Sequence, residues 1–69
     1  MHSLRATFLS DQADAALEVH IDLLASRESL RALIGGKPEW AVVDAAMLAA
    51  INASRVRAID ADRIAREAK

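Results

Sequence analysis

The chain has 69 residues, carries a net charge of −1 and contains no cysteine. A chain this short buries only about 60% of its unfolded surface, and a core of this size rarely leaves more than roughly 3 to 5 kcal/mol of stability. Without cysteine, disulfides and cysteine-based zinc sites are excluded. The near-zero charge excludes a global field that would steer nucleic acid or an anionic membrane. We therefore expect one small domain, residues 1–69, that a second chain stabilises.

The first nine residues predict an extended or irregular arm. Apolar and polar residues alternate there, as in a short strand with one apolar face: Leu4, Ala6 and Phe8 with Ser3, Arg5 and Thr7. Leu4 and Phe8 are also four residues apart, so an additional helical turn is the alternative. Because no continuous apolar stretch precedes the first acidic residues, we expect no secretory signal, and cytoplasmic is the default location.

Residues 10–34 predict a first helix, with Ser10 or Asp11 as its N-cap. At about 100° per residue, four acidic residues form one stripe: Asp11, Asp14, Glu18 and Asp22. Apolar residues and a histidine lie opposite: Ala13, Ala16, Leu17, His20, Leu23 and Leu24. The stripe is most simply a solvated face, and the alternative is a surface for a basic partner.

The pattern changes near Ser26. Arg27 and Arg31 fall on the apolar side, while Leu30, Leu33 and Ile34 turn away from it. We therefore expect the helix to bend or restart at Ser26.

A turn over residues 35–38 should follow. Gly35 and Gly36 are predicted to end the helix in the left-handed conformation that glycine adopts without steric cost, and Pro38 suits the first turn of the next helix. A connection this short joins antiparallel neighbours.

The second helix is predicted over residues 38–58. Its segment from Trp40 to Ile51 is polar only at Asp44, and its alanines favour a helix. A helix that is apolar on nearly every side must be enclosed on nearly every side. The remaining chain has too little apolar surface for that. The sequence thus predicts an all-α antiparallel hairpin that dimerises into a helical bundle. Residues 60–68 form a short C-terminal helix or continue the second one.

Eight residues are the predicted contacts with a second copy or another partner: Leu17, His20, Leu24, Trp40, Val43, Met47, Leu48 and Ile51. His20 is interpreted as a neutral interface histidine rather than a ligand. Asp44 needs a partner such as Arg27, Arg31 or a group of the second copy. Trp40 is interpreted as a plug that covers Leu33 and Ile34, and the alternative is a binding hot spot.

Nothing in the sequence has the spacing of a catalytic or cofactor site. We therefore expect no enzyme, cofactor, metal, small-molecule substrate or membrane span. Basic residues gather near the C-terminus, but acids are interleaved and no aromatic residue stands among them, so nucleic acid is not an expected partner: Arg55, Arg57, Arg63, Arg66 and Lys69. The predicted function is a homodimeric, non-catalytic protein-interaction module, such as an adaptor, inhibitor or assembly factor.

A DNA-binding regulator or antitoxin is the alternative. A strand-like arm followed by two helical segments meeting near Ser26 resembles the ribbon-helix-helix repressors and antitoxins. In that family paired strands enter the major groove. The resemblance implies that Ser3, Arg5 and Thr7 face the bases and that the chain from Ala53 onward binds a toxin.

Overall fold

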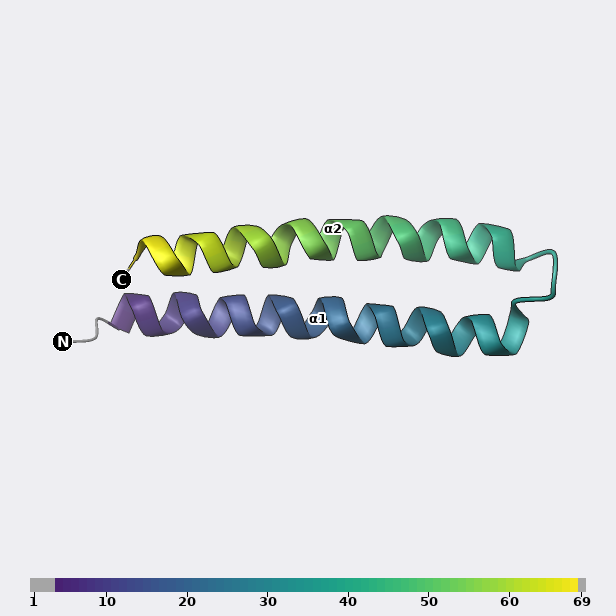
Figure 1. Ribbon diagram of the computed structural model, residues 1–69, viewed down its shortest axis with the longest axis horizontal. Coiled ribbons are helices and arrows are strands. Elements are labelled where there is room, and N and C mark those ends of the chain that lie inside the picture. Colours follow the sequence, from purple (N-terminus) through teal and green to yellow (C-terminus); the bar gives the residue numbers. More distant parts are fainter. Residues whose placement is uncertain (1–3, 69) are drawn as a thin grey trace.

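A computed structural model describes residues 4–68, which form two long helices packed antiparallel (Figure 1). Helix α1 spans Leu4–Ile34 and helix α2 spans Trp40–Glu67. The beginning of α1 and the end of α2 lie side by side at one end, and the turn closes the other. The predicted all-α antiparallel hairpin is confirmed.

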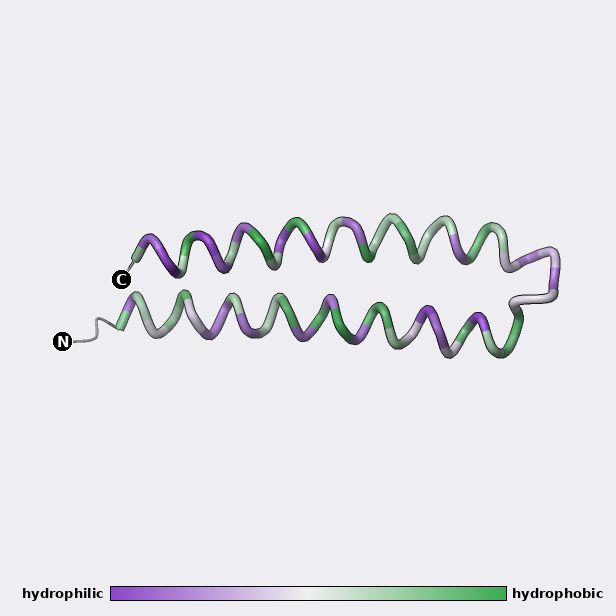
Figure 2. The backbone as a smooth tube through the Cα atoms, viewed as in Figure 1, coloured by the Kyte–Doolittle hydropathy of each residue, from purple (hydrophilic) through white to green (hydrophobic). Residues whose placement is uncertain are grey.

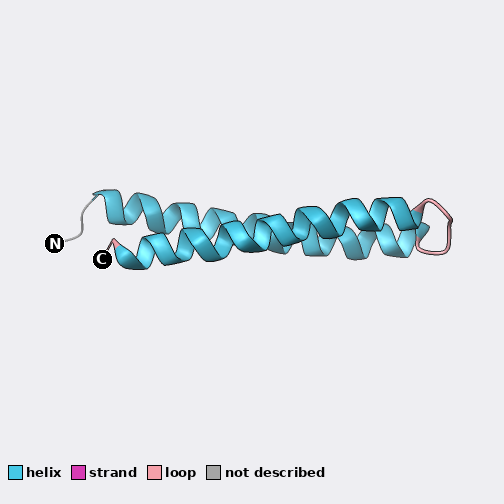
Figure 3. Ribbon diagram, turned by 90° about the horizontal axis from the view of Figure 1, so that it is seen from above, coloured by secondary structure: helices cyan, strands magenta, loops and turns pink. Residues whose placement is uncertain are grey.

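The less exposed residues recur at alternating steps of three and four along both helices. On α1 they are Ala6, Leu9, Ala13, Ala16, His20, Leu23, Arg27, Leu30 and Ile34, and Ser10 beside Leu9 is also half-buried. On α2 they are Trp40, Asp44, Met47, Ile51, Ser54, Ala58, Ala61 and Ala65, Val43 beside Asp44 is also half-buried, and Ala68 continues the spacing directly after the helix. This is the heptad spacing of a coiled coil, whose 3.5-residue period makes two helices wind about each other. The helices accordingly cross when the hairpin is seen from above (Figure 3).

The seam between the helices changes character along its length. Its open end is lined mainly by alanine from both helices, whereas its turn end holds larger residues such as Leu30, Ile34, Trp40 and Met47. In Figure 2 the half of α2 next to the turn is mostly green, and its other half carries many hydrophilic positions. Small residues let two helices approach closely, because interaxial distance follows side-chain size.

The hairpin is long and thin, measuring 55 × 15 × 10 Å. Its radius of gyration is 15.8 Å, whereas a compact chain of this length would have about 11 Å. The predicted exposure of the segment from Trp40 to Ile51 is confirmed, since Val42 is 76% and Leu48 47% exposed. Two helices side by side cannot enclose a helix that is apolar on most of its circumference.

The helix bounds differ from the first expectation at three places. Residues 4–9 are helical rather than extended, which agrees with the alternative of additional helix there, and residues 1–3 of the predicted arm lie outside the described residues. Helix α1 continues through Ser26 without interruption. Arg27 lies on the side of α1 that packs against α2 and pairs there with Asp44, so its position does not require a bend. Helix α2 extends beyond the predicted residue 58 to Glu67, so the described residues from 60 onward continue the second helix, which was one of the two arrangements expected for them.

The turn also differs from the prediction. Neither glycine has a positive φ, and α2 begins at Trp40 rather than in the turn containing Pro38. Main-chain hydrogen bonds hold the connection instead: the Gly35 amide donates to the Arg31 carbonyl over 2.8 Å, and the Trp40 amide donates to the Lys37 carbonyl over 3.0 Å. The backbone therefore turns without the left-handed residue that usually ends a helix. Along residues 4–68, neither helix holds a stretch long and apolar enough to cross a lipid bilayer.

Gly35→Ala and Gly36→Ala should have opposite effects on stability. A Cβ at Gly35 would collide with the Arg31 carbonyl oxygen, whereas a Cβ at Gly36 meets no atom within 4 Å. We expect Gly35→Ala to lower the free energy of unfolding by about 1 kcal/mol or more. Gly36→Ala should be neutral or stabilising by up to about 1 kcal/mol, because it restricts the unfolded chain. Urea denaturation of both variants measures this difference, and equal stabilities would contradict the predicted collision.

Candidate interaction surfaces

An ion pair joins the helices in the turn half of the hairpin. The Arg27 Nε donates a hydrogen bond to Asp44 Oδ1 over 2.7 Å, and about a quarter of each side chain is exposed. The hydrogen bond to the Asp44 carboxylate raises the pKa of Arg27 above its ordinary value, and the charges of Asp44 and Glu28 act in the same direction. Asp44 thus has the partner that the sequence predicted for it, and the hairpin satisfies the one charge of the apolar segment internally.

A second polar contact crosses the seam near mid-length. His20 Nδ1 lies 2.8 Å from the Ser54 hydroxyl oxygen, which in turn donates to the Ile51 carbonyl over 2.7 Å. Because the hydroxyl has one hydrogen and gives it to that carbonyl, His20 Nδ1 must carry the hydrogen of the first bond. Ser54 is buried and His20 is half-buried. His20 thus has a hydrogen-bond partner at the interface within the hairpin, and its predicted contact with a second chain stays a prediction.

Very little of the described chain is buried. Only Ala13, Ser54 and Ala65 are buried, and no large side chain is fully enclosed. The hydrophobic effect scales with apolar area removed from water, so the hairpin by itself obtains little stabilisation from this source.

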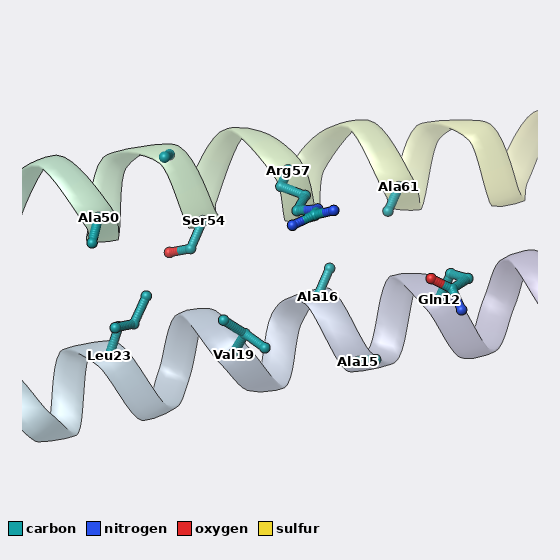
Figure 4. Close-up of a pocket in the computed structure, with 10 residues that line it drawn as sticks. Gln12, Ala15, Ala16, Val19, Leu23, Ala50, Ser54, Arg57 and Ala61 are labelled. Atoms are coloured by element: carbon teal, nitrogen blue, oxygen red, sulfur yellow. The ribbon is translucent and has the colours of Figure 1, made fainter.

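A shallow groove of about 620 Å³ runs between the helices on one face (Figure 4). We call it the alanine groove, and its lining residues are Gln12, Ala15, Ala16, Val19, Leu23, Ala50, Ala53, Ser54, Arg57 and Ala61. In Figure 4, Val19 and Leu23 rise from α1 toward Ala50 and Ser54 of α2. Arg57 is the one charged lining residue, and it has no ion pair among the described residues. Sequence reasoning missed the groove because its lining comes from both helices.

The eight predicted contact residues fall into two groups. Five are half-buried and lie along the seam: His20, Trp40, Val43, Met47 and Ile51. The other three, Leu17, Leu24 and Leu48, are 44–50% exposed and do not line the alanine groove. Helical spacing places them on the flank of the hairpin opposite the groove. We call these three residues the leucine row.

Trp40 does not cover both of the residues predicted beneath it. Ile34 is half-buried, but Leu33 stays 75% exposed. Leu33 is one residue before the seam position of Ile34, so the helical turn of about 100° directs it away from α2. The plug interpretation is therefore wrong for Leu33.

The predicted acidic stripe is an exposed face of α1. Asp11, Asp14, Glu18 and Asp22 are all exposed, and none forms an ion pair within residues 4–68. Near the end of α2 the charges pair locally instead, Arg63 with Asp60 over 3.5 Å and Arg66 with Asp62 over 2.9 Å. Such exposed pairs contribute at most about 1 kcal/mol to stability. Their main effect is to offset the positive charge of Arg63 and Arg66.

Among the described residues, no group of three or more histidine or acidic side chains is placed to hold a metal ion. The chain matches no known protein family, and searches of curated proteins and of solved structures gave no match.

Proposed function

We propose that this hairpin is a non-catalytic protein-interaction module that works as a homodimer. The observation that carries the proposal is the surface area of the chain, 5347 Å². A compact monomer of 7.4 kDa would expose about 4,200 Å². The excess of roughly 1,100 Å² compares with the roughly 800 Å² that each partner buries in a standard protein interface.

The thin interior supports the same proposal. Burial of apolar surface has to offset the conformational entropy lost when about 65 residues become ordered, yet only three of the described residues are buried. Large apolar side chains stay exposed along both helices, among them Phe8, Val19, Val42 and Ile59. Docking a second hairpin would bury apolar surface on each copy, as in four-helix bundles built from two hairpins.

Sedimentation velocity across a dilution series tests the proposal. The purified chain should sediment as a dimer at micromolar concentration, and its thermal unfolding midpoint should rise with concentration, because association stabilises the folded state by mass action. A fully folded monomer whose unfolding midpoint does not change with concentration would refute the homodimer.

We do not propose the ribbon-helix-helix alternative for this chain. Its paired strand would have to include Arg5 and Thr7, but both lie in helix α1. Ser3, the third residue assigned to base contacts, lies outside the described residues. Without a strand there, nothing in the described chain presents alternate side chains to a major groove.

A further inference from the structure

Two flanks of the hairpin are candidate contact faces for the second copy in the proposed homodimer. One holds the alanine groove and the other holds the leucine row. Both expose apolar side chains to a similar extent, as Val19 in the groove is 54% exposed and Leu17 in the row is 50% exposed. Exposure alone therefore does not choose between them.

The lining of the groove provides a further criterion. Eight of the ten lining residues of the groove are alanine, valine, leucine or serine, and Arg57 alone is charged. Helical spacing places charged residues on both flanks: Asp22 and Asp60 beside the groove, and Glu28, Arg31, Arg55, Asp62 and Arg66 around the leucine row. Asp22 and Asp60 do not line the groove. The cores of interfaces are depleted in charge because each unpaired charge must be desolvated. The lining of the groove can thus be buried with Arg57 as its one charged residue, while Asp22 and Asp60 stay at its rim in water.

The groove also has the shape that a helix needs. Ala15, Ala16, Ala50 and Ala53 keep its floor low, so a helix of another molecule can approach both α1 and α2 closely. Val19 and Leu23 project from α1 toward α2 and offer apolar contacts to such a helix (Figure 4). A two-fold dimer uses the same patch on both copies, and a patch that combines a low floor with projecting side chains can be complementary to itself.

We propose that the alanine groove is the homodimer face and that its occupant is a second copy of this chain. The excess surface of the hairpin is the amount that one such contact per chain would cover. This inference rests on the proposed function, and it departs from the sequence-based prediction by assigning the contact to Val19 and Ala53 instead of the leucine row.

Glutamate substitutions on the two flanks of α1 test the assignment. Val19→Glu would bury a carboxylate in the contact, and Leu17→Glu would leave one in water. Both replace an apolar residue of similar exposure by the same good helix former. We expect Val19→Glu to raise the dimer dissociation constant by on the order of 100-fold or more. Leu17→Glu should change it by roughly threefold or less.

A second pair tests the groove from α2. Ala53→Arg fills the floor of the groove, whereas Ala45→Arg changes an exposed alanine outside its lining. Sedimentation velocity gives the association state and circular dichroism gives the helix content. Loss of the dimer with Val19→Glu and Ala53→Arg but not with Leu17→Glu and Ala45→Arg supports the proposal, whether the separated chains stay helical or unfold.

The opposite pattern, or equal effects on the two flanks, overturns the groove assignment while the homodimer stands. A folded wild-type monomer removes the proposed function as well. In that case the groove would be left to a different protein, and this inference would be wrong.

Discussion

Replacing Ala65 by leucine should lower the free energy of unfolding by about 1 to 3 kcal/mol, a large part of what a domain of this size has. Ala65 is the least exposed residue of the described chain, at 4%, and it lies on the alanine-lined half of the seam. A leucine there has no space between the helices, so it must push α2 away from α1 and loosen the neighbouring seam contacts. Urea denaturation followed by circular dichroism measures the loss.

Ala45→Leu is the matched control for this prediction. It makes the same chemical change on the same helix, but Ala45 is exposed, so we expect a change of no more than about 0.5 kcal/mol. If Ala65→Leu were as stable as the wild type, the helices would not depend on small residues at the open end, and the close seam described above would be incorrect.

Replacing Ser54 by alanine should cost about 1 to 2 kcal/mol. The hydroxyl accepts the hydrogen bond of His20 Nδ1 across the seam and bonds to the Ile51 carbonyl within α2. Its removal leaves a half-buried imidazole N–H without a partner, and an unsatisfied buried donor costs more than the bond itself contributes. Urea denaturation of Ser54→Ala at neutral pH gives the cost.

The double variant His20→Leu with Ser54→Ala separates the hydrogen bond from other effects. When both polar partners are replaced by apolar groups, no donor is left unsatisfied, so the double variant should recover most of the stability lost in Ser54→Ala. A double variant that is as unstable as the sum of its two single variants would show that the two residues act independently. The two residues would then contribute through their packing alone.

The helices of this protein follow from local sequence features. Alanine and other good helix formers fill both segments, and the turn residues between them make antiparallel neighbours the natural arrangement. The predicted partner of Asp44 was also correct, because a carboxylate in an apolar segment needs a cation and Arg27 is at a suitable place.

The predicted break at Ser26 failed for a definite reason. Counting 100° per residue assumes a straight helix, whereas heptad spacing in a supercoil departs from that count by about 20° every seven residues. Over the 31 residues of α1 the difference accumulates, so a count of 100° per residue places Leu30 and Ile34 outside the apolar stripe. In the hairpin the helices wind about each other and keep both residues at the seam. Of the two arginines that suggested a break, Arg27 is part of the seam and Arg31 is exposed.

The sequence by itself determined that the chain is helical, that it folds back at residues 35–38 and that Trp40 to Ile51 has more apolar surface than the hairpin can cover, since propensity, turn chemistry and composition are local properties. Only the tertiary structure decided which residues meet. The seam, the His20 to Ser54 contact and the alanine groove each combine side chains from both helices. Their positions depend on how α1 and α2 wind and on their register, which side-chain packing along the whole interface sets.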